Sequence, residues 1–299
     1  MFLLIGNPDD SCCTDVIAVL RARRRNAEIV PNPMAQPTRV AWRFDASGST
    51  STFASSEDEM PRDDALAGVL VRGTGFINPA GWDTDDLGYI HAETQAAMLG
   101  WLWSLPCIVV NRYRASLWYR PHCSVHAWRP ALRRVGLLPP ALVISSVEAG
   151  TQAFAAELSA AGVPGAVYTP LTSRAQYLVG NARDWAGVSN LQRRMPVALT
   201  YPSGETFLAC VVGESVVWNG HCPQMVLALE GVIAAFAREA GLAFVEVVLA
   251  ATAEGLRVVD VNHQPQLERF NDPAREQIIE HLADLLMHPA TAPAALRSH

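Results

Sequence analysis

The residues best suited to chemistry lie near the C-terminal end of the chain, in two β-rich runs at 244–249 and 256–261. Glu246 lies in the first run, and Asp260 and Asn262 end the second. Residues i and i+2 of a strand point to the same side, so Asp260 and Asn262 present two oxygen ligands together. Glu246, on the preceding antiparallel strand, can add a third. Hard oxygens arranged in this way suit Mg²⁺ carrying the phosphates of a nucleotide. Alternatively, Asp and Asn only mark the exit of the strand into a turn.

The spacing of apolar residues predicts the helices and strands around these residues. Apolar residues recur at helical spacing over 224–240, which predicts one helix with one apolar face. Gly241 is placed to end that helix, because glycine tolerates the positive φ common just past a last turn. The turn 253–255 joins the two β-rich runs, and 273–287 is expected to form a closing helix.

This order of elements, ending in Asp-x-Asn-x-x-Pro, resembles the C-terminal part of ATP-grasp ligases. In that family the second strand ends in Glu-x-Asn followed by Pro, and those residues hold Mg-ATP. The resemblance implies that Asp260, Asn262 and Glu246 are the metal ligands here. Asp260 is a shorter carboxylate than the family's Glu, and a strict register places Val248 rather than Glu246 at the position of the other acid.

The N-terminal part predicts a parallel sheet, because it opens as strand, helix, strand. A later strand ends at Arg72, a helix containing Glu93 follows, and the next strand ends at Asn111-Arg112. This run resembles the ATP-grasp branch that ligates glutamate to protein tails or crosslinks ribosomally made peptides. Arg72 and Arg112 then lie at strand ends, where ligands bind in open α/β sheets. In the alternative interpretation both are surface charges at the edge of the sheet.

The sequence as a whole predicts an α/β, ATP-grasp-like fold in three parts. Residues 1–115 form an N-terminal parallel α/β domain, 116–200 a central small lobe, and 201–299 a C-terminal lobe with an antiparallel sheet. The α+β lobes are those expected to bind nucleotide. Strands at 197–200, 206–212 and 215–218 are expected to form a meander, with Gly213-Glu214 as a tight hairpin turn.

The chain departs from the family where a nucleotide would be held. It contains no lysine, whereas active members place two lysines over the phosphates. Arg129 or His126 stands near the first lysine position and Thr169 fills the second. Leu199 lies in the segment that reads adenine and ribose in the family, so Arg129, Thr169 and Leu199 are the expected cofactor contacts. The glycine-rich lid expected within 170–196 is reduced to Gly180 and Gly187.

Composition narrows the class of protein. The net charge is −6 over 299 residues, which argues against nucleic acid as a partner. No apolar run reaches the roughly 18 residues of a membrane helix, and no signal peptide is evident. These features predict a cytoplasmic protein with six reduced cysteines and no membrane contact. Four tryptophans, Trp101, Trp103, Trp118 and Trp128, are enough to line a cleft or a homodimer interface, although core positions suit them as well.

Two functions of different class follow from these observations. In the first, the chain is a divergent carboxylate-amine ligase that uses Mg-ATP to activate a carboxylate as an acyl phosphate. Arg72, Arg112 and Arg257 then hold carboxylate or phosphate oxygens, and the substrate is a small molecule or a peptide. In the second, the chain has lost ATP chemistry and acts as a peptide-binding or scaffold subunit for a protein partner.

A third interpretation is an unrelated metal-dependent enzyme that uses His122, Cys123 and His126.

Overall fold

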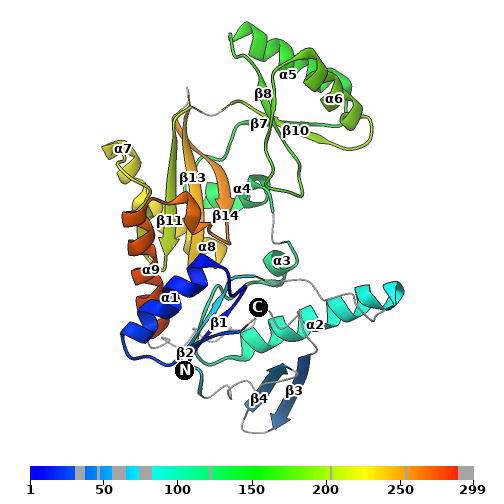
Figure 1. Ribbon diagram of the computed structural model, residues 1–299. Helices are drawn as coiled ribbons and strands as arrows, with labels where there is room; N and C mark the ends of the chain where they lie inside the picture. The colour runs from blue at the N-terminus through cyan, green and yellow to red at the C-terminus, as the bar shows by residue number, and fades with distance from the viewer. Residues whose placement is uncertain are drawn as a thin grey trace.

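The structure is a computed structural model that describes residues 1–30, 38–45, 48–55, 65–73, 83–120, 123–202, 204–252 and 255–288. Figure 1 shows a parallel sheet at the N-terminal end, a two-stranded antiparallel hairpin beside it, and two four-stranded antiparallel sheets, one of which lies apart at the top of the view. The mixed α/β architecture agrees with the fold class predicted from the sequence. Among the helices that the structure describes, none is both long and apolar enough to cross a membrane.

The N-terminal sheet has the strand order β2-β1-β5-β6, and all its pairings are parallel. Parallel neighbours need crossover connections, which are supplied by helices, as the strand-helix-strand opening predicts. A separate antiparallel hairpin, β3 and β4, follows β2. The sequence also predicts a solvated acidic loop at 57–64, and this segment lies outside the described residues. The elements are β1 (Phe2–Ile5), α1 (Ser11–Ala22), β2 (Ala27–Val30), β3 (Thr38–Asp45), β4 (Gly48–Ser55), β5 (Gly68–Val71), α2 (Thr84–Ser104) and β6 (Ile108–Val110).

The central sheet has the order β7-β10-β8-β9 and is antiparallel. Helices α5 and α6 lie above it in Figure 1 and pack on one face through Phe154, Leu158 and Val188. Residues of the opposite face, Val167, Thr169 and Thr200, line a small cavity together with Val259 of the C-terminal sheet. The elements are α3 (Ala115–Trp118), α4 (Val125–Arg134), β7 (Leu142–Ser145), α5 (Glu148–Ala160), β8 (Ala166–Thr169), β9 (Tyr177–Val179), α6 (Ala182–Gln192) and β10 (Val197–Thr200).

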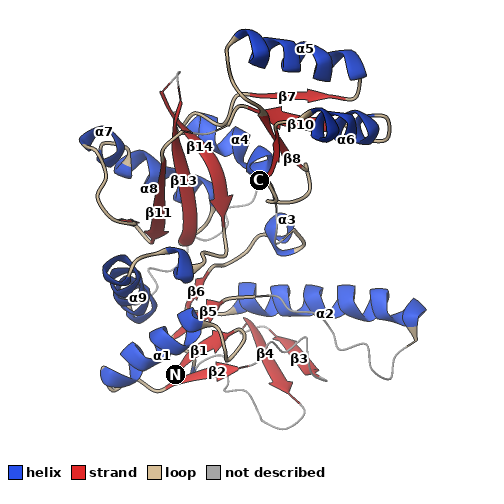
Figure 2. Ribbon diagram, turned by 45° about the horizontal axis from the view of Figure 1, so that its top comes forward, coloured by secondary structure: helices blue, strands red, loops and turns tan. Residues whose placement is uncertain are grey.

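The C-terminal sheet has the order β12-β11-β13-β14. One face packs on α8 and α4, where the rings of Trp128 and Phe236 meet edge to face with centroids 5.9 Å apart. Near the start of β13 the other face packs on α9 and α1, which lie side by side (Figure 2). The elements are β11 (Thr206–Val212), β12 (Ser215–Trp218), α7 (Gln224–Leu227), α8 (Glu230–Ala240), β13 (Phe244–Thr252), β14 (Gly255–Asn262), the 3₁₀ turn η3 (Leu267–Arg269) and α9 (Asp272–Met287).

Two local predictions are wrong. The predicted meander is not formed, because β10 pairs with β7 and β8 in the central sheet, and only β11 and β12 form a hairpin. The predicted helix over 224–240 is broken at Ala228 and Leu229 into α7 and α8. The predicted end of that helix is confirmed, since Gly241 adopts φ 70° there.

Asn111 joins the N-terminal sheet to the C-terminal sheet. It follows β6 and is 1% exposed. Its amide nitrogen donates to the carbonyl oxygens of Phe244, at 2.7 Å, and His263, at 3.2 Å. Its Oδ1 accepts from the backbone N–H groups of Ala243 and Phe244, both at 2.8 Å. One buried amide therefore satisfies backbone groups at the start of β13 and just past β14.

We expect Asn111→Ala to lower the free energy of unfolding by about 2–4 kcal/mol, because it leaves buried backbone donors and acceptors without partners. Urea unfolding followed by circular dichroism measures this loss. Asn190→Ala, at an exposed position on α6, is the control and should change stability by less than about 0.5 kcal/mol. A small effect at Asn111 would show that water replaces its hydrogen bonds.

Candidate active site

The pairing of β13 and β14 brings the predicted metal ligands to one face of the sheet. Glu246 lies directly opposite Asn262, and Val248 lies opposite Asp260. Asp260 and Asn262 are two residues apart, so their side chains share that face with Glu246. The irregularity in the pairing comes one step later, between Val248 and Leu249, and leaves this arrangement intact. Val248 therefore occupies the position that a strict register gives to the family's other acid, and the side chain of Glu246 lies on the same face of the sheet.

Asp260 is paired with an arginine from another part of the chain. Arg174, in the loop between β8 and β9, donates to both carboxylate oxygens, through Nη2 at 2.6 Å and Nε at 3.2 Å. The two side chains are only 18% and 16% exposed. A bidentate pair of this kind is among the stronger charged hydrogen bonds in proteins. The pair connects the central sheet to the C-terminal sheet.

Glu246 is completely buried and also has a cationic partner. Its carboxylate accepts from the backbone N–H of Gln266 at 3.0 Å and pairs with Arg269. Burial raises the pKa of Glu246 above its ordinary value, and the Gln266 N–H and Arg269 oppose that shift only in part. The Oδ1 of Asn262 accepts from the backbone N–H of Gln264 at 3.0 Å.

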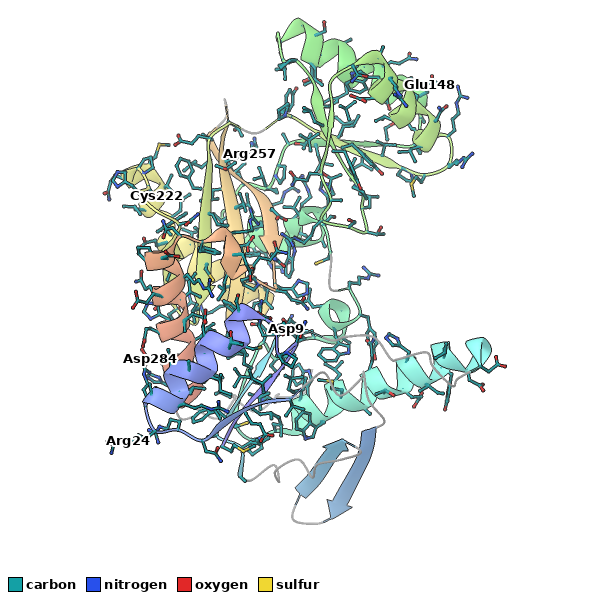
Figure 3. The ribbon with its side chains drawn as sticks, viewed as in Figure 1. Asp9, Arg24, Glu148, Cys222, Arg257 and Asp284 are labelled. Atoms are coloured by element: carbon teal, nitrogen blue, oxygen red, sulfur yellow. The ribbon has the colours of Figure 1, made fainter. Side chains whose placement is uncertain are left out.

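A cavity of about 540 Å³ opens between the central and C-terminal sheets. Its walls are largely apolar, with Pro140, Val163 and Tyr201 on one side and Val259 and Arg257 on the other. The sticks in Figure 3 show Arg257 at the end of the β13–β14 sheet that faces the central lobe. A size of several hundred Å³ and an apolar lining with few polar groups are typical of small-molecule sites.

A smaller cavity of about 20 Å³ shares Pro140, Thr200, Tyr201 and Val259 with the larger one. Its other walls include His126, Thr169 and Gln176. The ring nitrogens of His126 are buried and have no hydrogen-bond partner among the described residues. Burial, and then the charge of Arg129, lower the pKa of His126, so a neutral imidazole faces this space.

Two further guanidinium groups lie beside these cavities. Arg129 donates to the carbonyl oxygen of Pro140 at 2.6 Å, and Arg257 donates to that of Pro139 at 2.8 Å. Burial, followed by the charges of Arg133 and Arg257, lowers the pKa of Arg129. Two positive charges held this close create a local field that attracts an anion.

The structure places the other predicted site residues differently. Thr169 is buried at the end of β8 and lines the smaller cavity. The side chain of Leu199 packs in the core beneath α5 and α6, and its neighbours Thr200 and Tyr201 line the cavities instead. Because side chains alternate along β10, the side chain of Leu199 points to the opposite face from that of Thr200, and its predicted contact with a cofactor stays a prediction.

Arg72 and Arg112 have internal partners. Arg72 pairs with Asp10 at 2.9 Å and lies over the ring of Phe244, 5.6 Å from its centroid. Arg112 donates to the carbonyl oxygens of Leu102, Trp103, Leu105 and Cys107, at and just beyond the end of α2. Neither residue lines the cavities described above. Their predicted roles in holding substrate oxygens therefore stay predictions, and the observed contacts are structural.

The soft-metal interpretation gains no support. His122 lies outside the described residues, and Cys123 is buried, which raises the pKa of its thiol. Across the described parts of the chain, no group of three or more His, Cys, Asp and Glu side chains could hold a metal ion together. The set Glu246, Asp260 and Asn262 has two carboxylates and one amide, so a metal there needs the amide oxygen.

Sequence reasoning missed Arg174 and Arg269, the two cations that contact the predicted metal ligands. Arg174 lies in the sequence Thr-Pro-Leu-Thr-Ser-Arg, which begins at the second lysine position, Thr169. A basic residue shortly after that position in a chain without lysine was the available signal. Arg269 had no local signal, because its contact with Glu246 depends on the turn η3 after β14.

Comparison with known proteins identifies the fold. No protein-family model matches the sequence, and neither does any curated protein. Solved structures do match over nearly the whole chain. The macrocyclase MdnC from Microcystis aeruginosa MRC, bound with precursor peptide MdnA, superposes with a TM-score of 0.74 at 17% identity, covering 95% of this chain and 100% of that one.

Two other structures give the same result. The ATP-grasp ligase PsnB, complexed with minimal precursor, Mg and ADP, matches with a TM-score of 0.71 at 17% identity, over 95% of this chain and 97% of that one. A RimK domain protein ATP-grasp from Sphaerobacter thermophilus DSM 20745 matches with a TM-score of 0.60 at 16% identity, over 96% and 100%. The chain therefore has the ATP-grasp fold, as its motifs predicted.

The raised pKa of Glu246 gives a pH-dependent prediction. A carboxyl whose pKa is raised by folding contributes stability at low pH that is lost as pH rises through its folded pKa. Glu246→Gln removes that loss, so the unfolding free energy of the variant relative to wild type should rise as the pH is raised above the ordinary pKa of a glutamate, about 4.3. Urea unfolding in EDTA measures the difference.

Glu28→Gln, at an exposed position on β2, is the control and should show no such trend. A relative stability of Glu246→Gln that falls with rising pH would mean that Arg269 and the Gln266 N–H outweigh burial.

Proposed function

We propose that this chain is an ATP-dependent carboxylate-amine ligase, and that Glu246, Asp260 and Asn262 hold the Mg²⁺ of Mg-ATP. The observation that carries the proposal is the position of these three oxygen-bearing side chains on one face of the β13–β14 pair. Two carboxylates and an amide are hard oxygen donors of the kind Mg²⁺ prefers. The donor set fits the ion, provided that Arg174 gives up at least one oxygen of Asp260.

The interlobe cavity supports the same proposal. Its apolar walls suit a nucleotide base, Arg257 lines it, and Arg129 donates a hydrogen bond to Pro140 in its wall. In a chain without lysine, guanidinium groups are the side chains able to hold phosphate oxygens by paired hydrogen bonds. The Thr169 hydroxyl and the imidazole of His126, which has no hydrogen-bond partner among the described residues, can add neutral hydrogen bonds in the smaller cavity.

When bound, Mg-ATP supplies the phosphoryl group that converts a carboxylate into an acyl phosphate, which an amine then attacks. The residues of this chain contribute position and charge. Arg257 and Arg129 offset the negative charge of the transferring group, and contacts of this kind commonly lower the activation free energy by several kcal/mol. The apolar cavity walls exclude water, which protects an activated carboxylate from hydrolysis.

A peptide is the proposed substrate. The MdnC structure contains its precursor peptide, and the PsnB structure contains a minimal precursor. Both proteins share the fold over nearly their full length. Fold alone does not assign a substrate, so the peptide stays part of the proposal, and ligation of one of its carboxylates to an amine is the expected reaction.

A second candidate is a protein with this fold that has lost nucleotide chemistry and serves as a peptide-binding or scaffold subunit. It is favoured by the ion pairs at the site, since Asp260 and Glu246 already have arginine partners. Thr169 in place of a lysine points the same way.

Nucleotide binding separates the two candidates. Isothermal titration of the full chain with ATP should show binding that requires Mg²⁺, and Asp260→Asn should weaken it by about tenfold or more, because the ion loses a charged ligand. Asp284→Asn is the matched control. Asp284 lies on α9, away from the cavity (Figure 3), and the substitution removes one carboxylate from a partly exposed ion pair with Arg23, so binding should be unchanged.

Failure of the wild-type chain to bind ATP at millimolar concentration would contradict the ligase and favour the scaffold. If binding is present, ADP release with a carboxylate-bearing peptide and an amine, with loss of one water from the joined product, identifies the reaction.

A further inference from the structure

The loop between β8 and β9, residues 170–176, is the part of the central lobe that reaches the predicted metal ligands. Besides the bidentate pair of Arg174 with Asp260, the Nε2 of Gln176 donates to the carbonyl oxygen of Val259 at 3.3 Å. From the other side, Ser124 donates to the carbonyl oxygen of Leu171 at 3.1 Å. The loop thus bridges from α4 and the central sheet to β14.

The Arg174 guanidinium occupies the place where a metal would meet Asp260. It contacts both carboxylate oxygens. The charge of nearby Glu246 acts on it as well as that of Asp260. A divalent cation bound by these carboxylates would face a guanidinium a few Å away in a mostly buried site, where repulsion between like charges is weakly screened. The metal and Arg174 therefore compete for the same oxygens.

We propose that Arg174 and the metal ion exclude one another at Asp260, and that the displaced Arg174 becomes a contact for the phosphates of the nucleotide. This inference rests on the proposed ligase function. It assigns Arg174 as the cation that the chain, lacking lysine, supplies from the loop after Thr169. In the structure Arg174 closes the site across the two lobes, and metal entry opens that contact.

Two features of the loop favour the exchange. Gln176, on the same loop, lines the smaller cavity together with Thr169, so a released Arg174 stays close to the cavities proposed for the nucleotide. The guanidinium fork fits two phosphate oxygens as well as it fits two carboxylate oxygens, so its hydrogen bonds are replaced rather than lost.

The test compares wild type with Arg174→Gln in two titrations. In the first, Mn²⁺ without nucleotide is followed by the electron paramagnetic resonance of the free ion. The variant should bind Mn²⁺ about tenfold more tightly, because a competing charge is gone. In the second, ATP is titrated at saturating Mg²⁺, and the variant should bind it about tenfold more weakly, because a phosphate contact is gone. A merely structural Arg174 would not move the two affinities in opposite directions.

Arg238→Gln is the matched control. It removes one positive charge from an exposed ion pair with Glu214. Arg238 lies on α8, which packs on the face of the C-terminal sheet opposite to Glu246, so both affinities should equal those of wild type. Arg174→Lys provides a second variant that keeps the charge. It should bind Mn²⁺ like wild type and ATP more weakly, because an ammonium group lacks the fork.

Each outcome decides the inference. Unchanged or weaker Mn²⁺ binding by Arg174→Gln overturns the exclusion, and unchanged ATP binding overturns the phosphate contact. If wild type binds no ATP, the proposed ligase function and the phosphate contact fail together. The Mn²⁺ titration still decides the exclusion in that case, and absence of Mn²⁺ binding by both proteins overturns it.

Discussion

Two carboxylates on one face of a mostly buried sheet must be neutralised, and much of this structure follows from that requirement. Glu246 is completely buried, where an unpaired charge would cost several kcal/mol, and the side chain of Asp260 is only 16% exposed. The chain meets this need with Arg269 from the turn after β14 and with Arg174 from the central lobe. The second pair spans the two lobes, so the electrostatics of the proposed metal site and the closure of the cleft depend on the same contact.

The absence of lysine gives arginine several different tasks. Arg112 holds backbone carbonyl oxygens at the end of α2, and Arg72 pairs with Asp10. Arg257 lines the interlobe cavity, and Arg129 bonds to Pro140 in its wall. A guanidinium can do this because it is planar, carries five donors and keeps its charge when buried. Because of the same properties, an arginine that moves from a carboxylate to a phosphate, as proposed for Arg174, can take the place of a fixed lysine.

The fold and the site bear differently on function. Structures at 14–19% identity share the fold over nearly the whole chain, which identifies an ATP-grasp architecture and no more. The proposed ligase function is supported by side chains, namely Glu246, Asp260 and Asn262 on one face of the sheet and Arg257 in the wall of the neighbouring cavity. The alternative scaffold function is supported by the ion pairs that those carboxylates already form with Arg174 and Arg269. Whether a divalent cation can displace Arg174 is the physical question that separates them.

The sequence by itself determined the local elements. Periodicity placed β10, β11 and β12 at their observed bounds, Gly241 at the end of α8, and Asp260 beside Asn262 on one side of a strand. These features depend on residues close in sequence. Only the tertiary structure decided which sheet β10 joins, that Leu199 faces the core, and that Arg174 meets Asp260 across 86 residues. Such pairings depend on which surfaces of distant segments are buried together, and no short-range pattern encodes that choice.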